Sequence, residues 1–165
     1  MILYEKKFRL SNGVSFSRYI KTLDELNFSP YTLLISEMPG TKDYRIEIEI
    51  TDLTKLFWNW HNVFGGGVLF NECTVKHSKG EQFFTLQASI GTGNFLMALI
   101  FAVFSLLFLL VILSTTITKG VSSFRDLFMA IIVALVLSAP ATFTYIREKK
   151  LLDRIGTIGS QLKKK

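Results

Sequence analysis

The chain has 165 residues, of which 49% are hydrophobic and 19% charged, with a net charge of +6 and one cysteine. A globular domain carries about 25% charged residues. The deficit here is local, because the 37 residues between Glu81 and Lys119 and the 20 between Asp126 and Arg147 carry no charge. This is not the pattern of a purely soluble domain, and it excludes a disordered chain and a disulfide-stapled scaffold.

The first ninety residues alternate between strand and helix patterns. Along 44–51 the isoleucines Ile46, Ile48 and Ile50 alternate with charged residues, as in a sheet with one face in water. Asn12-Gly13 is also a hairpin signal, so a strand at 14–20 is an alternative to the helix at 15–26. We expect strands at 2–10, 31–37, 44–51, 68–76 and 82–89, and helices at 15–26 and 53–64. Residues 1–91 are therefore predicted to form an α+β domain, a small antiparallel sheet with two helices on one face in a split βαβ-like order.

The helix predicted at 53–64 contains the aromatic run KLFWNWHNVF. Trp58 lies off its apolar stripe and needs separate cover, and Trp is favoured where membrane meets water. Trp58 and Trp60 are therefore candidate membrane-interface residues. The alternatives are that Trp60 packs in the domain core, or that the aromatic residues line a ligand pocket.

Two uncharged stretches follow, at 95–117 and 127–146. The first has 23 residues and the second 20, and helices of these lengths reach about 35 Å and about 30 Å. A bilayer core of about 30 Å needs about 20 apolar residues. Residues 95–146 are therefore predicted to form a transmembrane helical hairpin. The alternative is a pair of helices buried in a soluble core.

Small side chains recur at helical spacing in both stretches. Small residues let helix backbones approach each other in a membrane. We expect them to form a packing seam, either within the hairpin or between copies of the chain. The candidates are Ala98, Ala102, Ser105, Ala130, Ala134, Ser138 and Thr142.

The last segment, 147–165, holds seven Lys or Arg against two acidic residues. An excess of Lys and Arg marks cytoplasmic flanks, so both termini are predicted to be cytoplasmic. Leu151, Ile155, Ile158 and Leu162 follow helical spacing, which predicts a basic amphipathic tail. Its role is setting topology, sensing anionic lipid or binding a partner. The candidate membrane-interface cations are Arg147, Lys149, Lys150 and Arg154.

Residues that could support catalysis or hold a metal are few. The set from which an acid/base pair could come is Asp52, His61, Glu72, Cys73 and His77. Cys73 and His77 would lie about 13 Å apart on a strand, too far to share a metal. Neither a P-loop nor a dinucleotide fingerprint is matched. We therefore expect no catalytic residue, metal or cofactor, and no nucleic-acid partner, because no basic cluster lies on the domain.

The sequence predicts a small integral membrane protein, non-catalytic, that presents an α+β interaction domain at the membrane. We expect its partners to be the lipid bilayer, including anionic lipid, and a protein partner or further copies of itself. Abundant Phe, Lys and Ile favour a bacterial cytoplasmic (inner) membrane. The alternatives are a subunit of an oligomeric channel or transporter, and a lipid-directed membrane enzyme.

Overall fold

The computed structural model describes residues 2–51, 68–70, 72–77, 82–119 and 124–162. The elements in chain order are β1 (Ile2–Arg9), α1 (Phe16–Glu25), β2 (Tyr31–Glu37), β3 (Tyr44–Ile50), β4 (Glu72–His77), β5 (Phe83–Ser89), α3 (Thr92–Lys119) and α4 (Phe124–Gln161). The helix predicted at 53–64, with Trp58 and Trp60, lies outside the described residues.

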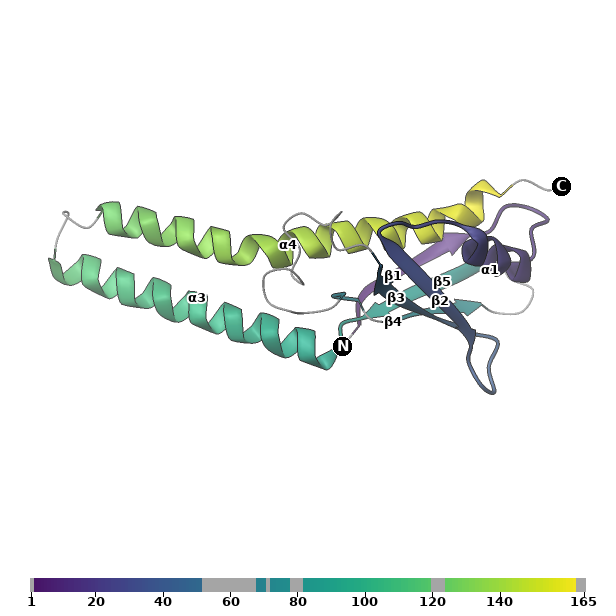
Figure 1. The fold of residues 1–165 in the computed structure, drawn as a ribbon, viewed down its shortest axis with the longest axis horizontal. Coiled ribbons are helices and arrows are strands. Elements are labelled where there is room, and N and C mark those ends of the chain that lie inside the picture. Colours follow the sequence, from purple (N-terminus) through teal and green to yellow (C-terminus); the bar gives the residue numbers. More distant parts are fainter. Residues whose placement is uncertain (1, 52–67, 71, 78–81, 120–123, 163–165) are drawn as a thin grey trace.

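The described strands form one five-stranded sheet in the order β1-β5-β4-β3-β2, antiparallel throughout (Figure 1). β2 to β5 follow one another as a meander, and β1 adds to the free side of β5. β1 and β2 therefore lie at opposite edges and run in the same direction, with α1 between them in the chain. The predictions of an α+β fold and an antiparallel sheet are confirmed.

The segment after Asn12-Gly13 is a helix rather than the alternative strand. Gly13 has a φ of 77°, and the turn leads into α1 instead of a hairpin. Ser15 caps the helix, because its hydroxyl accepts a hydrogen bond from the backbone N–H of Arg18 at 3.3 Å. Tyr19, Ile20 and Leu23 form the buried stripe of α1. That helical spacing outweighs the local turn signal.

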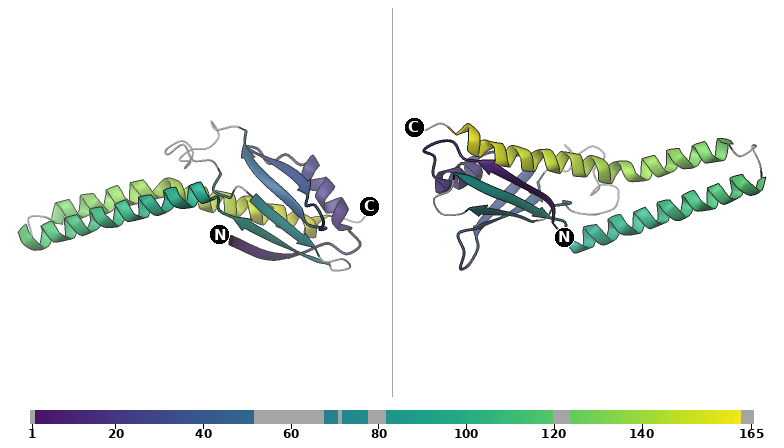
Figure 2. Two further views of the ribbon diagram at one scale, coloured as in Figure 1. Left: turned by 90° about the horizontal axis from the view of Figure 1, so that it is seen from below. Right: turned by 180° about the vertical axis from the view of Figure 1, so that it is seen from behind.

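One face of the sheet is the core. Ile46 and Ile48 are buried on this face, as their alternation predicts, and Phe84 and Leu86 of β5 join them. α1 and the second half of α4 pack over it (Figures 1 and 2). The opposite face carries polar side chains, among them Arg45, which forms ion pairs with Glu47 and Glu72.

α3 and α4 pack against each other as an antiparallel pair that extends away from the sheet (Figures 1 and 2). They have 28 and 38 residues, and α4 continues through Pro140 without interruption. At 1.5 Å per residue, α4 is about 57 Å long. Residues 147–161, predicted as an amphipathic tail, are thus the continuation of the helix that contains 127–146.

Judged on the described residues, no helix combines the length and the apolar character needed to cross a membrane. The predicted transmembrane hairpin is not supported by this finding.

Candidate functional site

The most distinctive feature of the structure is the junction at which α4 passes from the helical pair onto the sheet. Leu152 and Ile155 are completely buried there, and Leu151 is nearly so. Gly156 and Gly159 let the helix approach the strands closely. A Cβ at Gly156 would lie 2.3 Å from the ring of Phe8, and one at Gly159 would lie 2.9 Å from the ring of Phe84.

Glu148 is the buried acidic residue of this junction. Its Oε1 accepts a hydrogen bond from the backbone N–H of Leu69 at 3.1 Å, and its Oε2 accepts one from that of Phe70 at 2.8 Å. The side chain has no exposed surface. Burial raises the pKa of Glu148 to about 7, although the two N–H groups and Arg147 act in the opposite direction. α4 is therefore attached to the segment preceding β4 by a carboxyl group that titrates near neutrality.

Arg147 makes the second polar contact of the junction. Its Nε donates a hydrogen bond to the hydroxyl of Tyr31 at 2.8 Å, which joins α4 to the start of β2. Burial and the nearby Glu148 raise the pKa of Tyr31, and Arg147 partly offsets them. The ring of Tyr145 packs on that of Phe70, with centroids 5.9 Å apart. One turn of α4 thus contacts both the start of β2 and the segment that precedes β4.

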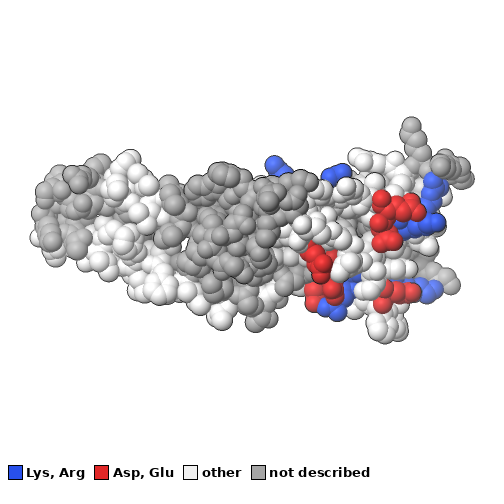
Figure 3. Space-filling view, in the orientation of Figure 1, with Lys and Arg blue, Asp and Glu red and all other residues white. Residues whose placement is uncertain are grey.

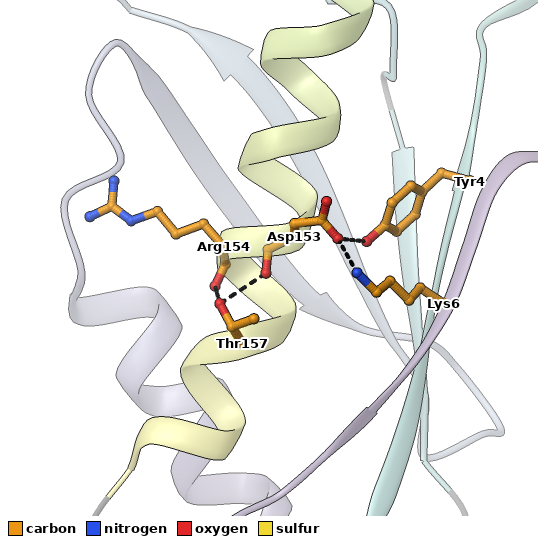
Figure 4. A network of polar contacts seen from close by, with 5 residues as sticks. All are labelled: Tyr4, Lys6, Asp153, Arg154 and Thr157. Carbon is orange, nitrogen blue, oxygen red and sulfur yellow. Dashed lines mark hydrogen bonds and ion pairs between the residues drawn. The ribbon is translucent and has the colours of Figure 1, made fainter.

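Farther along α4, two more polar contacts tie it to the domain. The buried hydroxyl of Tyr19 donates a hydrogen bond to the carbonyl oxygen of Ile155 at 3.0 Å. Asp153 accepts hydrogen bonds from Lys6 Nζ at 2.7 Å and from the Tyr4 hydroxyl at 2.9 Å (Figure 4). Burial acts to raise the pKa of Asp153, but the two hydrogen bonds act in the opposite direction, and the pKa is lowered. The helix is therefore joined to β1 as well as to α1.

The four predicted interface cations differ in their contacts and exposure. Arg147 donates a hydrogen bond to Tyr31. Lys149 lies over the ring of Tyr145, with Nζ 5.9 Å from its centroid, and the guanidinium of Arg154 lies 5.3 Å from the ring centroid of Phe28. Lys149, Lys150 and Arg154 are exposed. Only Lys149 and Lys150 are both exposed and within four residues of the end of the apolar stretch at 127–146.

The predicted packing residues are only partly described. α3 and α4 do pack together, which the seam requires. Ala102 and Thr142 are exposed, and Ser105 is half-buried. The side chains of Ala98, Ala130, Ala134 and Ser138 lie outside the described residues. Which side chains form the seam remains a prediction.

The candidate catalytic residues that the structure describes do not converge. Glu72 lies on the polar face of the sheet, whereas Cys73 is buried in the core. Burial raises the pKa of the Cys73 thiol to about 12, so it is a poor nucleophile. His77 stacks on Phe16 with ring centroids 4.3 Å apart. Asp52 and His61 lie outside the described residues, and no cluster of three potential metal ligands occurs among the residues described.

Sequence reasoning missed the junction. Glu148 lies in a cluster of charges, IREKK, that indicates a solvated flank, and nothing in that pattern marks it as buried. One signal was available: two glycines at 156 and 159 in an otherwise apolar stripe are typical of close packing against another element.

No family model matches the chain, and no curated protein or solved structure matches it either.

Proposed function

We propose that this is a small integral membrane protein in which α3 and the first half of α4 anchor the α+β domain at the cytoplasmic surface of a membrane. There the domain binds a protein partner without catalysing a reaction. The observation that carries the proposal is the continuity of α4, whose first half presents apolar side chains outward and whose second half is part of the domain core.

The surface of the helical pair supports insertion into lipid. Phe104 is 66% exposed, Ile117 75% and Phe128 58%. Monomeric soluble proteins rarely expose contiguous apolar patches larger than a few hundred square ångströms. In Figure 3 the charged side chains gather over the sheet and over the part of α4 nearest to it, and the rest of the described helical pair visible there is white. Other exposed apolar residues on the pair include Leu96, Leu99, Val103, Leu106, Leu107, Leu110, Val111, Leu113, Met129 and Phe143.

The contacts between the two ends of the chain support a common side for both. Lys6 of β1 binds Asp153 of α4, and Tyr19 of α1 binds the backbone of Ile155. Segments that touch cannot lie on opposite sides of a bilayer. With the excess of Lys and Arg after residue 146, this favours a hairpin with both termini in the cytoplasm.

The anchor has a mechanical consequence. The anchor and the core share one helix, and two glycines pack that helix closely against β1 and β5. The sheet is therefore held in a fixed orientation to the membrane instead of moving on a flexible tether. Confinement to the membrane plane also raises the effective concentration of the domain toward membrane neighbours.

The two edges of the sheet differ in how well they are protected from pairing with another strand. β1 carries Glu5, Lys6, Lys7 and Arg9, and charges on an edge strand oppose pairing. β2 has no charge before Glu37, and Leu34 on it is 45% exposed. The favoured partner contact is therefore an extended segment of another protein added beside β2.

A second copy of the chain fits this edge poorly. Two antiparallel copies of β2 would be related by a two-fold axis perpendicular to the sheet. α4 lies on the face of the sheet, so such an axis would send the two helical pairs in opposite directions. Both could not enter the same membrane. A different protein is therefore the expected occupant.

Extraction of membranes with alkaline carbonate tests the anchor. We expect the wild-type chain to stay with the lipid. The double variant Leu106→Arg/Leu110→Arg should be released, because each charge at the bilayer centre costs about 3 kcal/mol. The matched control Leu34→Arg/Phe83→Arg alters two exposed apolar residues of the sheet and should stay bound. Release of the wild type, or its recovery as a soluble oligomer, would contradict the anchor.

A photo-reactive cross-linker tests the partner surface. Placed at Ser36 of β2 in native membranes, it should give a protein adduct, and at Lys7 of β1 it should not. The partner should also slow amide exchange at Leu33 and Ile35. Along an antiparallel strand, the backbone groups of every second residue point to the same neighbouring strand. The Pro30 carbonyl and the Met38 N–H bond to Thr51 and Asp43, which flank β3. Leu33 and Ile35 are an odd number of residues away from both, so their N–H groups point away from β3. Adducts at both edges alike, or at neither, would contradict strand addition at β2. Ion conductance of the purified protein in liposomes would instead favour the channel alternative.

A further inference from the structure

We infer that the start of β1, Ile2 and Leu3, is a second membrane contact, which lies at the boundary between lipid headgroups and acyl chains beside the base of α3. This inference rests on the proposed anchor. It adds that the domain is seated on the bilayer as well as attached to it.

The sheet topology places these two residues at the base of the helical pair. Ile2 pairs with Ser89, the last residue of β5, and α3 begins three residues later at Thr92. Figures 1 and 2 show the amino terminus next to the start of α3 in every view. The other end of β1, at Arg9, pairs with Phe83, the first residue of β5, and so lies at the opposite end of β5 from the start of α3.

The exposed side chains of β1 are apolar at the end near the start of α3 and charged toward the other end. Ile2 is 54% exposed and Leu3 38%, whereas the exposed residues farther from the helices are Glu5, Lys6, Lys7 and Arg9. Charged side chains are one means by which a strand edge in water resists pairing with another strand. The uncharged end is the one that adjoins the proposed bilayer.

The strand pairing is irregular at these two side chains, as in a β-bulge. The register shifts between Ile2 and Tyr4, so Leu3 has no partner in β5. Bulges bend an edge strand and redirect its side chains. Tyr4, which follows, is buried in the core and bonded to Asp153, so the strand is held firmly just beyond the exposed pair.

Two exposed cations lie at the same level on α4. Asp153 of α4 accepts a hydrogen bond from Tyr4, so the turn of α4 that precedes Asp153 lies near the start of β1. Lys149 and Lys150 directly follow Glu148 and are both exposed. Apolar side chains next to Lys are typical of surfaces that rest on lipid, where the cations meet anionic headgroups. Lipid is therefore favoured over a protein as the occupant of this site.

Spin labels in reconstituted protein test the inference. A single cysteine replaces Ile2, Leu3, Phe104 or Lys42 in separate variants, each labelled and placed in vesicles of phosphatidylcholine and phosphatidylglycerol. Cys73 can be kept, because its thiol is buried and has a pKa of about 12. The wild-type chain should take up no label and serves as the labelling control.

We expect labels at Ile2 and Leu3 to collide with a water-soluble nickel chelate several-fold less often than the label at Lys42, which lies in the β2–β3 turn. Their collisions with oxygen should be more frequent than those at Lys42. The label at Phe104 should be the most shielded from nickel. If Phe104 is shielded while Ile2 and Leu3 match Lys42, the inference is overturned and the anchor stands. If Phe104 also matches Lys42, the anchor itself fails.

Discussion

Both halves of α4 carry apolar side chains, but these side chains have different surroundings. In the first half Phe128 and Phe143 are more than half exposed, whereas in the second half Leu152 and Ile155 have no exposed surface. The second half packs on a sheet of the same chain. The first half has only α3 beside it among the described elements. The sequence of an apolar helix face thus does not determine what packs against it. Whether the face belongs to the core depends on the element that lies beside it.

The largest expected effect comes from truncating the same residue type in each half. Ile155→Ala should lower the free energy of unfolding of the domain by about 2–5 kcal/mol, because it leaves a cavity in a packed core. Ile131→Ala, at a residue 44% exposed, should change it by less than about 0.5 kcal/mol. Urea denaturation in mild detergent, followed by circular dichroism, measures both. Equal losses of unfolding free energy in the two variants would contradict the proposed difference between the two halves of α4.

Glu148 marks the boundary between the halves. Glu148→Ala should cost about 1–3 kcal/mol, because the buried N–H groups of Leu69 and Phe70 lose their acceptors. Glu148→Gln keeps one acceptor oxygen and should cost less. The same denaturation assay compares them at pH 5. A loss for Gln as large as for Ala would show that the acceptor is not what stabilises the junction.

The pH dependence of stability follows from the same carboxyl group. The pKa of Glu148 is about 7 in the folded state and about 4.5 when unperturbed. Between these values the folded state holds a proton that the unfolded state has released. The contribution of Glu148 to stability is therefore fully present below about pH 4.5 and is lost as pH rises to about 7. Wild type minus Glu148→Gln should show this fall across pH 4.5–7, and a flat difference would refute the raised pKa.

A smaller effect is expected from the bond between α1 and the second half of α4. Tyr19→Phe removes the donor to the Ile155 carbonyl and should cost about 0.5–1.5 kcal/mol. Tyr44→Phe is the matched control, since no hydrogen bond of the Tyr44 hydroxyl occurs among the described residues. Thermal unfolding of both variants provides the comparison. An equal effect of the two substitutions would mean that the buried bond contributes nothing.

The smallest effect belongs to the exposed pair of Lys6 and Asp153. The Lys6 side chain is 53% exposed, and exposed ion pairs contribute about 0–1 kcal/mol. Asp153→Asn should therefore lower stability slightly, and the loss should shrink as salt is added. Its lowered pKa means that the contribution is present above the unfolded pKa and is lost as pH falls. A loss that is independent of salt would point to the Tyr4 bond instead.

Much of the domain could be predicted from sequence because its strands alternate. Ile46 and Ile48 point inward and Glu49 outward, as period two requires. The helix at 15–26 was also predictable, from its apolar spacing and its Ser15 cap. The strand order was not, because pairing β1 with β5 depends on contacts between residues far apart in sequence, such as Glu5 and Gln87, which are 82 residues apart.

The junction could not be predicted, for a physical reason. The stripe of Leu151, Ile155 and Ile158 has the same spacing whether it rests on a sheet, a partner or lipid. The burial of Glu148 depends on two backbone N–H groups that precede β4, and backbone groups leave no trace in side-chain patterns. Only the glycines at 156 and 159 hinted at a neighbouring strand.

Hydrogen exchange of the full chain in lipid nanodiscs tests the continuity of α4 most directly. The structure predicts slow exchange that runs without a break from the apolar stretch through Arg147 and Glu148 to about Ile158. Slow exchange up to residue 146 followed by rapid exchange over 147–158 would contradict a shared helix. The domain would then be a separate body on a flexible tether.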